Sequence, residues 1–236
     1  MDTAKPRGRD LKRKVFDLLQ SDNFDQALHE LLQLSARQVI NPLFSSLLSS
    51  DEQIKWRTVS AMGKVVANLA DEDMESARVV MRRLMWLLND ESGGIGWGAP
   101  EVMGEVMASH EGLAKEYASV LVSYVREDGN FLEYEPLQRG AVWGVGRMAQ
   151  VRPHMVQDAV PHLILFLESS DATVRGMAAW TVGLLRATAA RVKLEALLED
   201  DAALLLYLNR ELVPRSVNAL AKEALGAITD TQPPAT

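Results

Sequence analysis

Five glycines recur along this chain at nearly constant spacing, and they constrain its fold more than any other feature. They are Gly63, Gly104, Gly146, Gly183 and Gly226, with successive separations of 41, 42, 37 and 43 residues. An apolar residue stands nine positions before each glycine, a small residue stands five positions before it, and another apolar residue directly precedes it. A period near 40 residues is typical of helical repeats, in which each copy is one supersecondary unit. The chain is therefore predicted to be an array of similar helical hairpins.

The best-formed copy shows which kind of repeat this is. In residues 171–185, the sequence DATVRGMAAWTVGLL places Asp171, Val174, Arg175, Ala178, Ala179 and Gly183 as the motif of HEAT-like repeats would have them. Over residues 41–228 the chain resembles that family by pattern, including the short form found in phycobilisome lyases. The other copies depart at the arginine position, where they read Lys55, Gly96, Gln138 and Asn218. The resemblance implies an all-α fold, a right-handed α-solenoid of HEAT-like helical hairpins whose second helices line the concave side.

Periodicity and turn residues place the individual elements. Apolar residues at helical spacing predict an N-terminal hairpin from residues 11–19 and 24–34. First helices of the repeats are expected at residues 38–48, 74–88, 113–126, 155–167 and 192–198. The apolar runs 203–208 and 212–217 predict a short β-hairpin near the C-terminus, and a broken helix ending before Pro214 is the alternative. We expect a flexible arm at residues 1–10, one HEAT-like repeat domain at 11–229 and a flexible tail at 230–236.

One loop concentrates glycine in an otherwise helical chain. Residues 93–98 contain Gly93, Gly94, Gly96 and Gly98, and glycine is tolerated where a positive φ or a close backbone approach is needed. Pro100 suits the first turn of a helix, so a helix should begin near Gly98. Free backbone N–H groups at such a helix start suit an anion or the carbonyls of a partner, with Gly94 and Gly96 as contacts. The alternative is a helix C-cap followed by a tight loop between helices.

The second helices carry an unusual set of side chains on the face opposite their apolar columns. This face holds the positions seven before, three before and one after each glycine. Across four copies it reads Trp56, Ser60, Lys64; Trp97, Glu101, Glu105; Arg139, Trp143, Arg147; and Gly176, Trp180, Leu184. Four of the five tryptophans therefore lie where solvated residues would be ordinary, and tryptophan and arginine are the types most enriched in binding hot spots. The alternative is a ladder of salt bridges between repeats, with tryptophans packed between turns.

Composition removes several classes of site. The chain has no cysteine, which excludes disulfides, thiolate catalysis and cysteine-ligated zinc. Its four histidines lack metal-ligand spacing, and the oxygen-rich loop 126–136 lacks the EF-hand pattern, so no metal and no cofactor are predicted. No familiar catalytic motif is present, and no catalytic residue is assigned. The sequence also lacks an apolar run of the ~20 residues that span a bilayer and an apolar leader segment, which predicts a cytoplasmic protein that does not enter membranes.

Charge bears on nucleic acids. The formal net charge is −7, whereas proteins that bind phosphate backbones are usually basic. The one clustered basic stretch, residues 5–14, is interpreted as part of a solvated arm, although a local basic patch is the alternative.

These observations favour a non-enzymatic HEAT-repeat scaffold that binds a protein or peptide partner on its concave face. In this hypothesis the apolar anchors are Trp97, Trp143 and Trp180, the polar contacts are Glu101, Glu105, Arg139 and Arg147, and the loop glycines Gly94 and Gly96 contact partner backbone. The alternative is a DNA-binding protein, because Trp97-x-x-x-Glu101 with arginines and Trp180 is similar to HEAT-like alkylpurine DNA glycosylases. Against that alternative stand the acidic balance and a glutamate where that family would have aspartate. A third hypothesis is a role in modifying a partner, as in lyase and hydroxylase relatives.

Overall fold

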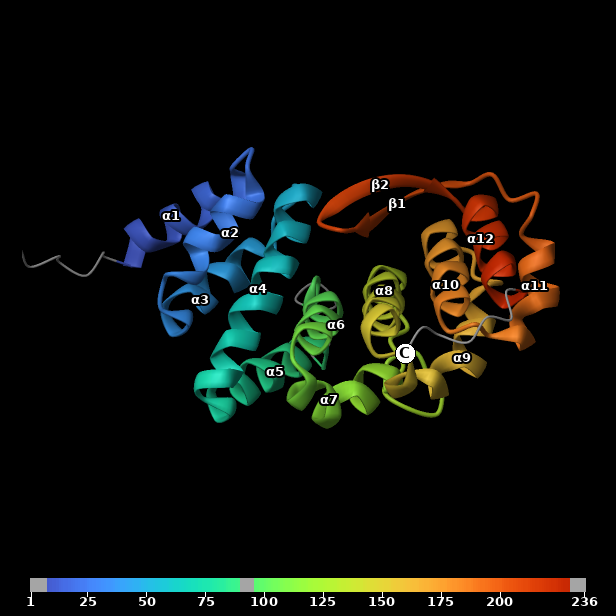
Figure 1. The fold of residues 1–236 in the computed structure, drawn as a ribbon, viewed down its shortest axis with the longest axis horizontal. Helices are drawn as coiled ribbons and strands as arrows, with labels where there is room; N and C mark the ends of the chain where they lie inside the picture. Colours follow the sequence, from blue (N-terminus) through green and yellow to red (C-terminus); the bar gives the residue numbers. More distant parts are fainter. Residues whose placement is uncertain (1–7, 90–95, 230–236) are drawn as a thin grey trace, which may run out of the picture. The chain divides into compact units, whose positions relative to one another are not determined.

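The computed structural model describes residues 8–89 and 96–229, which fold into two compact units (Figure 1). Unit 1 is Met1–His110 and unit 2 is Glu111–Thr236. In a repeat array each copy contacts only its neighbours, so one repeat domain can divide into two compact units without forming separate domains. The single domain at residues 11–229 stays a prediction, and the units are described one at a time.

Unit 1 consists of six described helices. They are α1 (Gly8–Gln20), α2 (Phe24–Leu32), α3 (Ala36–Ser46), α4 (Glu52–Glu72), α5 (Met74–Leu88) and α6 (Ala99–Ser109). Asn23, Asp51 and Asp73 cap three of them, because each side chain accepts a backbone N–H from the first helical turn. The predicted N-terminal hairpin is α1 and α2, and α1 starts early enough that residues 8–10 are helical. Most of the buried side chains of unit 1 are aliphatic or methionine, with a few aromatic and polar residues among them.

Unit 2 has shorter and more irregular first helices. Its helices are α7 (Glu111–Ser123), α8 (Glu135–Val151), α9 (Val160–Phe166), α10 (Ala172–Leu184), α11 (Arg191–Ala196) and α12 (Val217–Thr229), with 3-10 turns at Pro153–Met155, Gln157–Ala159 and Thr188–Ala190. The helix expected at residues 155–167 is therefore a 3-10 turn followed by α9. Pro161 lies in the first turn of α9, where its missing N–H costs nothing.

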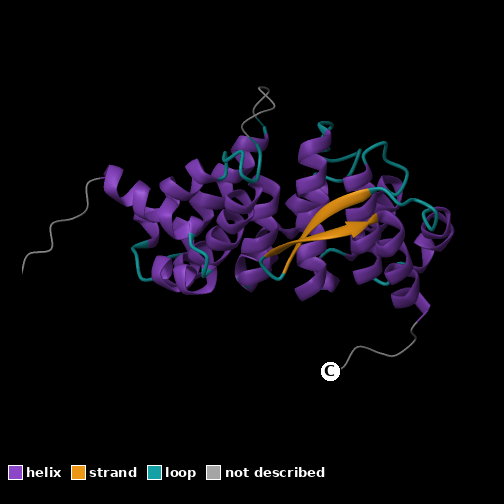
Figure 2. Ribbon diagram, turned by 90° about the horizontal axis from the view of Figure 1, so that it is seen from above, coloured by secondary structure: helices purple, strands orange, loops and turns teal. Residues whose placement is uncertain are grey.

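The C-terminal β-hairpin is present, and the alternative of a broken helix is wrong. Strand β1 (Ala203–Leu208) pairs antiparallel with β2 (Glu211–Ser216), and Figure 2 shows this ribbon as the extended part of an otherwise helical described chain. Asn209 and Arg210 form the two-residue turn with φ of 50° and 69°, as a turn matched to strand twist requires. Pro214 is tolerated because β2 has no second neighbour in this two-stranded sheet.

Three of the five repeated glycines, Gly63, Gly146 and Gly183, lie where one second helix touches the next. A Cβ on Gly63 of α4 would collide with the side chain of Glu105 on α6, and one on Gly146 of α8 would collide with the ring of Trp180 on α10. A Cβ on Gly183 of α10 would come within 2.8 Å of the Ala224 Cα on α12. Gly226 on α12 has nothing within 4 Å, and α12 is the last second helix. The period of the sequence is thus a period of close helix contacts.

None of the helices in residues 8–89 and 96–229 is both long and apolar enough to cross a bilayer.

Candidate functional site

The turn before α6 positions the best-exposed tryptophan of the predicted face. Gly98 has a φ of +80° and is the N-cap residue of α6, and the amide of Val102 donates to its carbonyl at 2.9 Å. A side chain at Gly98 would be strained by this backbone, and its Cβ would lie 3.0 Å from Leu47 Cδ2. The carbonyl of Gly96 accepts from Ala99 N at 3.0 Å. The predicted helix start is confirmed, while Gly93 and Gly94 lie outside the described residues.

Trp97 lies in this turn and presents its ring to solvent. Trp97 is 42% exposed. The Lys55 ammonium from α4 lies 5.8 Å from the centre of the Trp97 ring and 5.8 Å from that of Trp56. An ammonium at this range is attracted by the negative face of an indole. We call Trp97, Lys55, Trp56 and Glu101 the Trp97 cluster.

Glu101 supplies the carboxylate of the Trp97 cluster, and it is buried. The residue is 4% exposed, and its Oε1 lies 3.6 Å from Lys55 Nζ. Its Oε2 is buried without a hydrogen-bond partner. Burial raises the pKa of the Glu101 carboxyl above its ordinary value; the nearby Lys55 opposes this shift, and the charge of Glu52 adds to it. A buried oxygen left unpaired is costly, so this position is unexplained by stability alone.

The expectation that Glu101 and Glu105 face solvent is not met. Glu105 is 7% exposed, and its side chain packs against the backbone at Gly63. Lys55 and Gly63 both belong to α4, so α4 covers the side of α6 that carries the two glutamates. The sequence argument treated the face opposite the apolar columns as free, whereas α6 is buried on all sides from Ala99 to Ala108.

In unit 2 the expectation that Trp143 faces solvent is also not met. The residue is 1% exposed, its indole Nε1 donates to the carbonyl of Tyr207 at 3.0 Å, and the two rings lie 6.2 Å apart. Tyr207 belongs to β1, whose Leu204 also lies against Gly176 of α10. The β-hairpin of the chain itself therefore covers part of the second-helix face that the sequence assigned to a partner.

The other predicted residues of unit 2 remain accessible in part. Arg139 keeps 45% of its side chain exposed and forms an ion pair with Asp171, donating from Nε at 3.0 Å. Partial burial raises the pKa of Asp171, but hydrogen bonds from Arg139 and from the Val174 amide outweigh it and leave that pKa lowered. Arg147 donates to Gln150 Oε1 at 3.3 Å, and Trp180 is half-buried with its ring against Gly146.

Sequence reasoning missed the central role of Lys55. This lysine occupies the column of Arg175, and the sequence analysis treated it only as a departure from the family motif. Arg175 bonds Asp200 at 2.9 Å and the carbonyl of Ser169 at 2.8 Å, which is a structural role. Lys55 instead reaches the two indoles and Glu101. The signal in the sequence was its place directly before Trp56.

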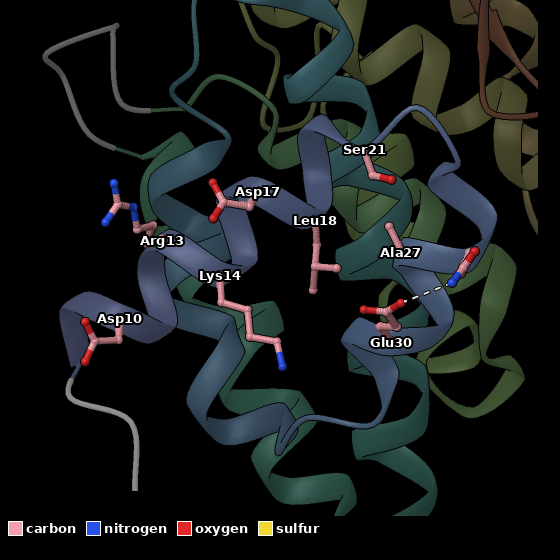
Figure 3. A pocket seen from close by; sticks show the side chains of 9 residues that line it. Asp10, Arg13, Lys14, Asp17, Leu18, Ser21, Ala27 and Glu30 are labelled. Atoms are coloured by element: carbon pink, nitrogen blue, oxygen red, sulfur yellow. Dashed lines mark hydrogen bonds between the residues drawn. The ribbon is translucent and has the colours of Figure 1, made fainter.

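The basic N-terminal stretch forms one wall of a pocket in unit 1. The pocket has a volume of about 440 Å³ and is lined by residues of α1 and α2 and the turn between them. Figure 3 shows Lys14 and Leu18 of α1 on the side that faces Ala27 and Glu30 of α2. Arg13 and Lys14 share this lining with Asp10, Asp17 and Glu30, so the charge is mixed in sign. A lining of mixed charge does not favour binding of a nucleic-acid phosphate backbone.

The described residues offer no cluster suited to a metal ion. No group of three or more histidine, aspartate or glutamate side chains in residues 8–89 and 96–229 is placed to hold one. The oxygen-rich loop uses Asp128 to pair with Arg126 at 2.8 Å, and Asn130 donates to Ser123 Oγ at 3.0 Å.

Comparison with known families identifies the repeat. Residues 135–185 match the family described as HEAT-like repeat. This segment runs from the start of α8 to the end of α10 and contains the motif at residues 171–185, so the resemblance inferred from the sequence is confirmed there. A protein of Archaeoglobus fulgidus described as uncharacterized is 28% identical over 124 residues, which cover 51% of this chain. The match spans about half of that relative, 57% of its length.

Solved structures confirm the fold class. An engineered protein aligns with a TM-score of 0.54 and 19% identity, covering 93% of this chain and 98% of that one. A designed armadillo repeat protein in complex with the peptide (KR)4 aligns with a TM-score of 0.51 and 18% identity, covering 93% of this chain and 99% of that one. A computationally designed armadillo repeat protein for modular peptide recognition aligns with a TM-score of 0.51 and 20% identity, covering 92% of this chain and 99% of that one. The fold is that of helical-repeat solenoids, with the short β-hairpin as an addition.

Proposed function

We propose that this chain, which contains a HEAT-like repeat and has the fold of helical-repeat solenoids, is a non-enzymatic scaffold that binds a protein or peptide partner through the Trp97 cluster. The observation that carries the proposal is the exposed Trp97 ring, whose neighbour Lys55 also contacts a buried carboxylate with one unpaired oxygen. Polar groups that violate the rule of satisfied burial are concentrated at functional sites in natural proteins.

The chemistry of the Trp97 cluster suits a polypeptide. A partner side chain can cover the ring of Trp97, which buries a large apolar area at little entropic cost. The unpaired oxygen of Glu101 is itself buried, so the polar group that a partner meets is the ammonium of Lys55, which lies against both the Trp97 ring and this carboxylate. A charge-assisted hydrogen bond from this ammonium is about twice as strong as a neutral one. Lys55 holds the opposite oxygen and fixes the orientation of the carboxylate.

In unit 2 we propose a smaller role for the predicted residues. Arg139, Arg147 and Trp180 keep accessible surface and remain candidate contacts within their own unit. Trp143 acts there as a structural residue that anchors the β-hairpin, because its indole N–H donates to the Tyr207 carbonyl and its ring lies against the Tyr207 ring. Gly96 is proposed to contact partner backbone beside Trp97. The designed neighbours support a peptide-binding role for this fold, and that support is by analogy.

The proposal is tested by selecting binders from a random peptide library on phage, with two variants as controls. Trp97→Ala removes the exposed ring of the cluster. Trp86→Ala removes another exposed tryptophan of unit 1, on α5, which is 76% exposed and outside the cluster. Peptides enriched on the unmodified protein should bind Trp86→Ala equally well and should be lost on Trp97→Ala. Failure to enrich any peptide whose binding is lost on Trp97→Ala would overturn the assignment.

DNA binding is the alternative that the same variants distinguish. Fluorescence anisotropy with duplex and single-stranded DNA, at low and physiological salt, measures it directly. The proposal predicts no salt-sensitive binding, because the chain is acidic overall and Arg13 and Lys14 share their surface with carboxylates. Salt-sensitive binding that Trp97→Ala abolishes would favour the DNA alternative and call for an activity assay on alkylated bases.

A further inference from the structure

A second surface, in unit 2, combines an aromatic floor with an acidic rim. The groove lies between the loop that follows α7 and helix α9 and has a volume of about 330 Å³. Its apolar lining consists of Val125, Phe131, Leu165 and Phe166. The rings of Phe131 and Phe166 are stacked, with centroids 6.1 Å apart and an interplanar angle of 21°. Leu165 is 51% exposed, so it adds accessible apolar surface beside the two rings.

The rim of this groove carries an excess of negative charge. Its glutamates are Glu127, Glu133, Glu135 and Glu168, and its other polar residues are Gln138, His162, Ser169 and Ser170. Lys193 pairs with Glu168 at 2.7 Å, and Ser170 donates to Glu135 at 2.9 Å. Among the described residues, Glu127 and Glu133 have no ion-pair partner. The nearby arginines are committed elsewhere, because Arg126 pairs with Asp128 and Arg139 with Asp171.

This combination of charge and shape selects one kind of occupant. The carboxylates surround the groove without converging, since the described residues contain no metal-binding group. Phosphate groups of nucleic acids or of anionic lipids would be repelled by the rim. A volume of this size accepts a large side chain, and the aromatic floor favours an apolar one. Lysine or arginine on either side of that residue would then meet Glu127 and Glu133.

We propose that this groove, which we call the Phe131 groove, binds a short basic segment of a partner protein with one large apolar side chain flanked by lysines or arginines. The apolar side chain packs on Phe131 and Leu165, and the flanking cations lie over the unpaired glutamates. The proposal does not rest on the Trp97 cluster, which lies in unit 1. Because the rim charges are exposed, the interaction weakens as the salt concentration rises.

Three fluorescein-labelled peptides test the proposal by anisotropy on the full chain. The first has one phenylalanine flanked by two lysines on each side, the second has alanine in place of phenylalanine, and the third has glutamate in place of every lysine. The first peptide should bind, the second should bind about tenfold or more weakly, and the third should not bind, because both the apolar and the charged contacts are needed.

Matched variants locate the binding. Leu165→Lys removes apolar surface from the groove, and Val192→Lys makes the same change in charge on α11, where Val192 is 76% exposed. Glu127→Lys with Glu133→Lys reverses the rim, and Glu195→Lys is its exposed control on α11. The groove variants should weaken the first peptide at least about tenfold, and the controls should retain its affinity. Equal binding by groove and control variants, or equal binding of the first two peptides, would overturn the proposal, whereas loss on Trp97→Ala alone would place the peptide on the Trp97 cluster.

Discussion

Two glycine substitutions test whether the period of the sequence is a period of helix contacts. Gly183 of α10 and Gly226 of α12 occupy the same column of the repeat, but only Gly183 faces a following helix. Gly183→Ala would bring a methyl group to 2.8 Å from both Cα and Cβ of Ala224, and backbone cannot move away as a flexible side chain can. Overpacking of this kind costs about 1–3 kcal/mol. Gly226→Ala meets no atom within 4 Å and should gain about 0.5–1 kcal/mol from the lower backbone entropy of alanine.

The entropy gain of alanine applies to both variants, so they should differ in unfolding free energy by the overpacking cost of about 1–3 kcal/mol, with Gly226→Ala the more stable. For a chain of this length, a difference of about 2 kcal/mol corresponds to roughly 4–8 °C in Tm. Thermal unfolding followed by helical circular dichroism measures both, and retention of the folded signal at low temperature is the control. If Gly183→Ala is as stable as Gly226→Ala, then the glycines do not mark close helix contacts and the account of the repeat is mistaken.

Four further predictions concern individual side chains. Trp143→Ala should lower the unfolding free energy by about 3–5 kcal/mol, and Trp97→Ala by less than about 1 kcal/mol, because only Trp143 is buried; urea unfolding compares them. Burial raises the pKa of Glu101 from its ordinary 4.5, so the folded state holds this proton more tightly and stability is lost as the pH rises from 4.5 through the folded pKa. Glu101→Gln should therefore be more stable than the unmodified protein at neutral pH. Urea titrations at several pH values should show that this advantage disappears near pH 4.5. Burial raises the pKa of Tyr124 to about 12, so alkaline absorbance titration should show a late-ionising tyrosine that Tyr124→Phe removes, with the matching stability lost as the pH rises above 10. Replacing Asp171 by alanine should remove the N-cap of α10 and the partner of Arg139, lowering stability by about 1–2 kcal/mol in thermal unfolding, whereas no change would show that neither contact matters.

The architecture could be predicted because its causes are local or periodic. The glycine column reports close helix contacts, and the β1 strand was predicted with the bounds that the structure shows, because 203–208 is a continuous apolar run ending at a turn pair. The predicted bounds of the first helices of unit 2 were less accurate. Prolines at 153 and 161 start helical segments without indicating how short those segments are.

The site was predicted only in part, because exposure depends on which elements cover a helix. Helical geometry placed Trp143 and Glu101 on the face away from the apolar columns, but it could not reveal that β1 lies over Trp143 or that α4 packs against Glu101. Trp97 escapes such covering because it stands in a turn before the helix and not within it. The pairing of Lys55 with Glu101 joins residues far apart in the sequence, and no single-sequence pattern reports such a contact.

The most direct test of the scaffold account is the affinity of one library-selected peptide for the unmodified protein, Trp97→Ala, Trp86→Ala and Glu101→Gln. A residue at the centre of a binding surface costs about 2 kcal/mol or more on truncation, which is roughly a thirtyfold loss of affinity. The account predicts that loss for Trp97→Ala, a smaller loss for Glu101→Gln, and unchanged affinity for Trp86→Ala. If every selected peptide binds Trp97→Ala and Trp86→Ala with equal affinity, the account is contradicted.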